Sequence, residues 1–225
     1  MTEPAGKKTP SLPTIAGLII SLFSLAFFAI WYRDWFGITV TSVLIREASI
    51  FGFVALLFFI IRREGLDLTS IGLHFTAVGK SVAWGMLFFV LSMAGILLCV
   101  LAMQYLGWKV GGEEAGAYKD IPVWVLFIMV VRAGIAEEVF YRGYAIERIK
   151  AWTGSTGVAV AVPLIIFSVG HFRQGPGGIL ISFVAGAILT ATYLWKKDLL
   201  ANMVAHFTVD FIPNVALPLL GVENS

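Results

Sequence analysis

Long apolar stretches follow one another along almost the whole chain, and only short polar segments separate them. About 20 apolar residues suffice to cross a bilayer as a helix, in which the backbone groups pair within the segment. The pattern therefore predicts an all-α polytopic membrane protein with about seven transmembrane helices, or eight if one more segment enters the membrane. The seven expected spans are residues 13–32, 39–61, 80–106, 122–149, 155–171, 179–195 and 199–220.

Composition agrees with this pattern. Of the 225 residues, 59% are hydrophobic and 13% are charged, whereas soluble domains carry about 25% charged residues. We expect one transmembrane domain over residues 1–225, with a polar N-terminal tail at 1–12. The net charge of +2 gives no reason to expect a nucleic-acid partner. The single cysteine, Cys99, excludes an internal disulfide and a CxxC zinc site.

The distribution of lysine and arginine predicts the orientation, because cytoplasmic loops carry an excess of these residues. With a cytoplasmic N-terminus, nine of them fall inside and four outside. We therefore expect a multi-pass protein of a prokaryotic cell membrane with its N-terminus in the cytoplasm. The inner set is Lys7, Lys8, Arg62, Arg63, Lys80, Arg148, Lys150, Lys196 and Lys197, and the outer set is Arg33, Lys109, Lys119 and Arg173.

The fourth span carries three charged residues within six positions, Glu137, Glu138 and Arg142. Each such charge costs about 2.5–3.5 kcal/mol at the centre of a membrane helix on insertion scales. Glu138 and Arg142 are four residues apart and share a helix face, whereas Glu137 is rotated by about 100°. One glutamate can thus pair with the arginine while the other faces a cavity and acts as a general base. The alternative is a purely structural Glu–Arg pair.

Two histidines lie in later spans at depths comparable to that of Glu137. His171 ends the fifth span, and His206 belongs to a polar stripe on the seventh. The stripe repeats every four residues, which places its members on one helix face. Its members are Asn202, His206, Asp210 and Asn214. The convergence of acids, imidazoles and amides favours a functional site over scattered structural polar residues.

Three further charged residues lie within spans. Adjacent residues on a helix do not face each other, so Arg46 and Glu47 are expected to find partners on other helices. Arg132 lies near the outer part of the fourth span. For all three we favour structural pairing, with a place on the substrate path as the alternative for Arg132.

In their order, these motifs resemble the CPBP family of type II CAAX prenyl endopeptidases and bacteriocin-processing proteins, also called the ABI family. The resemblance covers residues 122–215. It consists of Glu-Glu-x-x-x-Arg at 137–142, Phe-x-x-x-His at 167–171, and His206 with a polar residue four positions later. Members of the family are described as intramembrane glutamate proteases.

The resemblance implies a role for each residue. Glu137 would activate a water molecule that His171 helps to hold, while Glu138 and Arg142 orient their helix. His206 and the residue at position 210 would stabilise the oxyanion. The family often has asparagine there, and an ionised Asp210 cannot donate a hydrogen bond. Asp210 would then orient His206 or act in its protonated form, and Asn202 or Asn214 could supply the amide donor.

The function expected from these residues is hydrolysis of peptide bonds in membrane-associated peptides or proteins, which could be lipidated. No Gly-x-Ser-x-Gly elbow or His-Glu-x-x-His motif offers another hydrolytic centre. We expect no cofactor. A variant in which His171, His206 and a glutamate hold a divalent metal is a weaker alternative. Two others are a proton-coupled transporter, since intramembrane charges also mark proton relays, and a non-catalytic membrane scaffold.

Overall fold

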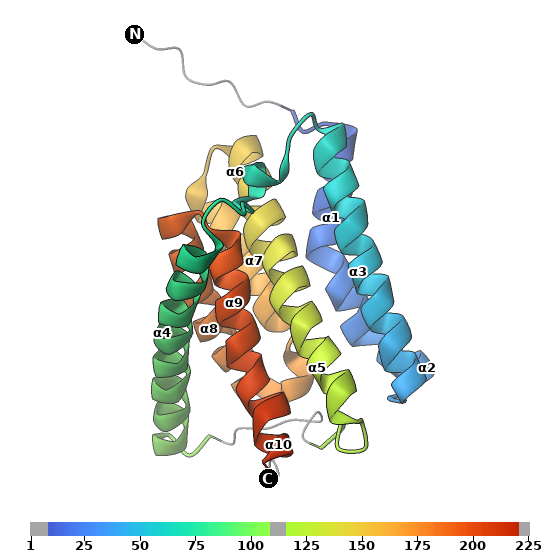
Figure 1. The fold of residues 1–225 in the computed structure, drawn as a ribbon, viewed down its shortest axis with the longest axis vertical. Helices are drawn as coiled ribbons and strands as arrows, with labels where there is room; N and C mark the ends of the chain where they lie inside the picture. The colour runs from blue at the N-terminus through green and yellow to red at the C-terminus, as the bar shows by residue number, and fades with distance from the viewer. Residues whose placement is uncertain (1–8, 109–115, 221–225) are drawn as a thin grey trace.

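The computed structural model describes residues 9–108 and 116–220, and all regular structure in these residues is helical (Figure 1). This confirms the expected all-α polytopic fold. Residues 1–8 of the expected polar tail lie outside the described residues, as do Lys7, Lys8 and Lys109.

Five helical segments are long and apolar enough to cross a membrane, and each matches an expected span. The first is the continuous run of α1 (Leu12–Phe27), η1 (Phe28–Tyr32) and α2 (Arg33–Phe36). The next two are α3 (Val40–Arg63) and α4 (Val78–Tyr105). The fourth joins η4 (Phe172–Gln174) to α8 (Gly175–Lys196). The last contains α9 (Leu199–Phe211), η5 (Ile212–Ala216) and α10 (Leu217–Leu219).

The two remaining expected spans are also helical but differ in character. One is a continuous helix made of α5 (Val123–Arg132), η3 (Ala133–Ala145) and α6 (Ile146–Thr153), and it carries the charged motif. The other, α7 (Thr156–Val169), is apolar but only 14 residues long. In Figure 1, α9 lies between α4 and the α5–α6 helix, and α1 and α3 lie on the far side of that helix.

Local sequence signals explain several helix ends. Thr39 and Ser42 form a capping box at the start of α3, and Ser155 and Asp198 cap the starts of α7 and α9 through side-chain oxygens. Gly154 ends α6 with a φ of 71°, which a glycine adopts without the strain that a Cβ causes. These signals place the short turns of the bundle.

The segment η3 is a π-helix of 13 residues inside an otherwise α-helical span. π-Helical turns pair each N–H with the carbonyl five residues earlier and often occur at functional sites. This geometry brings residues five apart in sequence closer together than an α-helix does. All but one of its residues are buried, and it contains both motif glutamates and Arg142.

Two glycines allow α9 to lie close to its neighbours. A Cβ atom at Gly85 of α4 would lie 2.7 Å from Val204 Cβ, and one at Gly134 of η3 would lie 3.0 Å from Phe207 Cβ. Such distances are shorter than normal carbon contacts, which optimally lie at about 3.5–4.0 Å. The missing side chain at Gly85 therefore lets α9 pack closely against α4, and the one at Gly134 lets it pack closely against η3.

The turns of the bundle separate the positive charges into two groups. The expected inner residues Arg62, Arg63, Lys80, Arg148, Lys150, Lys196 and Lys197 lie at the end of the bundle marked by α6, and Arg33, Lys119 and Arg173 lie at the end marked by α2 and α10 (Figure 1). The predicted orientation depends on this separation of lysine and arginine residues between the two ends. The orientation itself stays a prediction.

The loop between α3 and α4 contains η2 (Leu68–Ile71), which packs against η3 at the end of the bundle marked by α6. Asp67 caps this turn, and hydrogen bonds from the hydroxyl and backbone N–H of Thr69 hold the pKa of the Asp67 carboxyl below its usual value. The Ile71 carbonyl accepts a hydrogen bond from the Tyr193 hydroxyl at 3.1 Å. The loop is thus tied to α8.

Candidate active site

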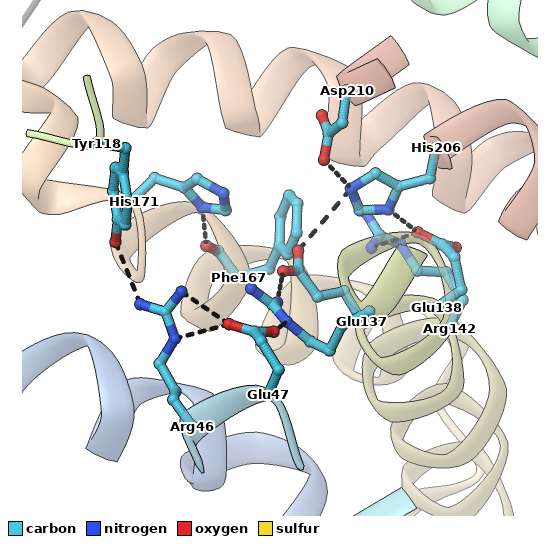
Figure 2. Close-up of polar contacts among 11 residues, drawn as sticks. Arg46, Glu47, Tyr118, Glu137, Glu138, Arg142, Phe167, His171, His206 and Asp210 are labelled. Carbon is cyan, nitrogen blue, oxygen red and sulfur yellow. Dashed lines mark hydrogen bonds and ion pairs between the residues drawn. The ribbon is translucent and has the colours of Figure 1, made fainter. Parts of the chain in front are cut away.

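Glu138 is completely buried and makes three polar contacts (Figure 2). Its Oε1 lies 3.0 Å from Arg142 Nη1 and 2.7 Å from His206 Nδ1, and its Oε2 accepts a hydrogen bond from Asn202 Nδ2 at 3.3 Å. Both carboxylate oxygens are therefore occupied by partners on η3 and α9. The Glu138 carboxylate therefore holds the side chains of Arg142, His206 and Asn202 in place.

Arg142 extends this cluster towards α7 and α8. Its guanidinium carbon lies 4.4 Å from the centre of the Phe167 ring, and its Nη2 donates to the Gly186 carbonyl at 3.3 Å. A Cβ atom at Gly186 would lie 2.9 Å from the same Phe167 ring, so the glycine permits this approach. Glu138 and Arg142 thus link four helical segments. Their spacing of four residues indicated only the contact between the two side chains.

Glu137 has a more open environment. It is 9% exposed, and its Oε1 lies 2.8 Å from Arg132 Nη1. Its Oε2 lies 3.9 Å from His206 Nε2, which is too long for a direct hydrogen bond. In the part of the chain that the structure describes, Oε2 has no hydrogen-bond donor. One oxygen of Glu137 is anchored and the other faces the space beside His206 (Figure 2).

A chain of alternating charges leads from Glu137 to α3. Arg132 donates through Nε to Glu47 Oε2 at 2.6 Å while it holds Glu137 through Nη1. Glu47 is 1% exposed and also accepts from Arg46 Nε at 2.8 Å. Arg46 Nη1 donates to the Tyr118 hydroxyl at 3.1 Å. The α3 helix therefore contributes to the surroundings of Glu137, which the motifs did not indicate.

This network corrects one expectation. Arg46 and Glu47 do have partners outside α3, as expected, but they also contact each other although they are adjacent. The arginine side chain is long enough to fold back along the helix to the neighbouring carboxylate. The Cβ atoms of adjacent helical residues do point in different directions, but a side chain as long as arginine can still reach its neighbour.

The two histidines lie on either side of Phe167. The ring of His171 lies 4.9 Å from the Phe167 ring centre, and that of His206 lies 6.3 Å from it. His171 Nδ1 lies 2.8 Å from the Phe167 carbonyl oxygen. Since a carbonyl only accepts, Nδ1 carries the proton, and in this tautomer Nε2 is the acceptor of the ring. No direct His171–Glu137 hydrogen bond occurs among the residues described.

The polar stripe on α9 does not act as a unit. Asn202 is buried and also donates to the Leu189 carbonyl, at 2.6 Å. Asp210 Oδ2 lies 3.5 Å from His206 Nε2, and its side chain is 33% exposed. Asn214 is exposed and donates to the Asp210 carbonyl at 2.9 Å. The stripe therefore brings Asn202, His206 and Asp210 to the cluster, and Asn214 turns back to its own helix.

A tie at the opposite side of the site holds the loop that follows His171. Arg173 donates to the Ala29 carbonyl at 2.8 Å and to the Ile30 carbonyl at 3.2 Å, and its Nη2 lies 2.6 Å from Asp34 Oδ1. These acceptors belong to η1 and α2 of the first span. The His171 loop is thus fixed to the N-terminal helix.

A metal site was a weaker alternative. Within residues 9–108 and 116–220, no three His, Cys, Asp or Glu side chains are arranged so that they could hold a metal ion. Metal analysis of the purified protein, described below, tests this alternative.

The fold and these contacts define a multi-pass helical membrane protein with a buried centre of carboxylates, arginines and histidines. Residues 119–212 match the family model of the type II CAAX prenyl endopeptidase Rce1-like proteins. The match agrees with the resemblance that the motifs indicated, and at the family level it supports an intramembrane CAAX-type protease. It includes both glutamates, both histidines and Asp210. Comparisons with curated proteins and with solved structures gave no match.

Proposed function

We propose that this protein is an intramembrane endopeptidase in which Glu137 activates a water molecule. The observation that carries the proposal is the difference between the two adjacent carboxylates. Glu138 has both oxygens occupied by neighbouring side chains, whereas Glu137 keeps Oε2 without a direct donor among the described residues. A general base needs a free oxygen within hydrogen-bond reach of the proton that it removes.

In the proposed reaction, Glu137 Oε2 takes a proton from water as the water oxygen attacks the peptide carbonyl carbon. The carbonyl oxygen becomes the oxyanion of a tetrahedral intermediate. Glu137 then returns the proton to the leaving amine as the C–N bond breaks. His171, with Nε2 as an acceptor, helps to hold the attacking water. Arg132 orients Glu137 through its contact with Oε1.

His206 is proposed to donate to the oxyanion through Nε2. Because Nδ1 faces Glu138, Nε2 is the nitrogen that faces the open side of the site. This role requires the imidazolium form, in which both ring nitrogens donate. We assign Asp210 to the orientation of His206, since its Oδ2 lies 3.5 Å from Nε2. Asn202 is proposed to support Glu138, because its amide already donates to two acceptors.

The role of Asp210 can be tested by two replacements. Asp210→Asn keeps a polar group near His206 and adds a donor, so kcat should stay within about threefold of the wild type. Asp210→Ala removes the orienting contact and should lower kcat about tenfold, since misorientation of a reacting group can cost up to about 100-fold. Cleavage kinetics in proteoliposomes check this. Equal kcat values for the wild type and Asp210→Ala would contradict the assignment.

Arg132 and Glu47 offer a second test. Arg132→Gln should lower kcat by about 100-fold with little change in KM, because Glu137 loses its orienting partner. Glu47→Gln acts through Arg132 and should have a smaller effect, about tenfold, on the same parameter. The matched control is Glu64→Gln, which breaks another buried pair in which Arg148 Nε lies 2.8 Å from Glu64 Oε2.

The control separates loss of orientation from loss of stability. Glu64→Gln should lower the thermal stability of the protein and leave kcat per folded molecule unchanged. If all three variants lost activity only in proportion to their loss of folded protein, Glu47 and Arg132 would be structural.

The proposed substrate is a peptide or protein in the membrane, and the proposed setting is a prokaryotic cell membrane with the N-terminus in the cytoplasm. The experiment that tests function compares the membrane peptides of cells that express the wild type with those of cells that express Glu137→Gln. Peptide products that appear only with the wild type would support the protease and identify its substrates. Identical peptide sets would contradict it.

The same preparations address the alternatives. Metal analysis and chelator treatment of the purified protein test a metal-dependent mechanism. That mechanism predicts a bound divalent ion and a loss of cleavage when the chelator is added. Ion flux in proteoliposomes tests proton-coupled transport. A scaffold predicts that Glu137→Gln replaces the wild type fully in cells, which the protease does not.

A further inference from the structure

A second polar site lies away from the glutamate centre, at the end of the bundle marked by α6. Here a pocket of about 240 Å³ opens between the start of α4 and the end of α8. Its lining includes His74, Thr76, Lys80, Trp84 and Lys196. Because α4 and α8 both end here as candidate membrane spans, the pocket lies at the level where lipid headgroups meet water.

Two of the basic side chains that line the pocket, Lys80 and His74, have no polar partner among the described residues. In the part of the chain that the structure describes, neither Lys80 nor His74 forms a side-chain hydrogen bond or an ion pair. The third group is held in place by aromatic rings. Lys196 Nζ lies 3.7 Å from the centre of the Trp84 ring and 3.9 Å from that of Trp195. Cation–π contacts of this kind fix an ammonium group and leave its charge available.

Asp198 is the carboxylate among the described residues that line the pocket, and its oxygens are engaged by other groups. Asp198 accepts a hydrogen bond from Ser81 Oγ at 2.7 Å and from the Ala201 backbone N–H at 3.0 Å, where it caps α9. No ion pair joins Asp198 to either lysine among the described residues. The pocket therefore has two lysine charges against one carboxylate, together with further donors on Thr76 and Trp84. This excess of positive charge and donors suits an anion.

We propose that this pocket binds a phosphate ester, which the bilayer supplies as the headgroup of an anionic phospholipid. Basic pockets between transmembrane helices bind anionic headgroups, and tryptophan side chains are enriched at the same level of the membrane. The pocket is large enough for a phosphate with its ester carbons. Lys80 and Lys196 bind the phosphate oxygens, and Trp84, which also lines the pocket, packs beside the glycerol.

Native mass spectrometry of the full-length protein in detergent tests the proposal, with phosphatidylglycerol or phosphatidylcholine added at equal concentration. The wild type should retain one phosphatidylglycerol molecule in preference to phosphatidylcholine. Lys80→Gln and Lys196→Gln should each weaken this retention about fivefold, since a basic residue near an anionic headgroup contributes roughly that factor. Lys150→Gln is the matched control, because Lys150 is exposed at the same end and does not line the pocket.

The outcomes are distinct. Equal retention by the wild type and the Lys80→Gln, Lys196→Gln double variant would overturn the proposal, as would equal retention of both lipids. Displacement of phosphatidylglycerol by millimolar inorganic phosphate would overturn the lipid as the source of the ligand. Lys80 is exposed, and its side chain forms no hydrogen bond or ion pair with the described residues, so Lys80→Gln should fold normally. This variant therefore still tests the proposal if Lys196→Gln is unstable.

Discussion

Purified Glu137→Gln is expected to insert and fold like the wild type and to lose 10²–10⁴-fold in cleavage of a membrane substrate. A positioned general base contributes roughly this factor, and the amide of glutamine cannot take up the proton of the attacking water. The replacement preserves side-chain volume and keeps an acceptor for Arg132 Nη1, which now lies 2.8 Å from Oε1. The measurement is kcat in proteoliposomes, with thermal unfolding of the same preparation.

The matched control is Glu138→Gln, the same change one residue along the helix. Glu138 is fully buried between Arg142, His206 and Asn202. Its neutralisation leaves the Arg142 guanidinium without a counter-charge, so this variant should lose stability as well as activity. If Glu137→Gln kept full turnover while Glu138→Gln lost it with its fold intact, the roles of the two glutamates would have to be exchanged.

Arg142→Ala is expected to destabilise the folded protein by about 3–5 kcal/mol, the usual cost when one partner of a buried ion pair is removed. The change leaves the buried Glu138 carboxylate without its arginine partner. It also removes the contact with the Phe167 ring and the hydrogen bond to the Gly186 carbonyl. Thermal or denaturant unfolding of the full chain in detergent measures the loss. Arg62→Ala is the control, because Arg62 is exposed at the end of α3, and it should change stability by less than about 0.5 kcal/mol.

A double-mutant cycle tests whether the loss of stability comes from the Glu138 carboxylate that is left without its partner. Glu138→Gln combined with Arg142→Ala should be less destabilised than the sum of the two single variants, because residues in one ion-pair network are not additive. Additive losses would mean that Arg142 acts mainly through Phe167 and α8.

The positions of the helices and the Glu138–Arg142 pair were predictable from the sequence. Apolar length determines a membrane span, and a spacing of four residues joins the pair. The contact between Arg132 and Glu137 was not predictable in this way, because residues five apart do not share a face of an α-helix. It exists where α5 passes into the π-helical segment η3. No apolar periodicity signals that change of helix type.

Other parts of the site depend on tertiary packing. Glu47 is far from the motifs in sequence and enters the site only because α3 packs against α5. The sequence places His171 at the end of the fifth span, yet α7 ends at Val169 and His171 lies in the turn before η4. Asn202 and Asn214 share a stripe, but the choice of partner for each amide depends on which carbonyl lies nearby.

The tie between Arg173 and the first span has a consequence for how much of the chain makes a working unit. The segment that matches the family begins at residue 119, yet the loop after His171 is held by Ala29, Ile30 and Asp34, and Arg132 is held by Glu47. A fragment that contained every motif and lacked the first two spans would keep the reacting groups and lose two of their anchors. The N-terminal third of this chain is thus a brace for chemistry encoded in the remainder.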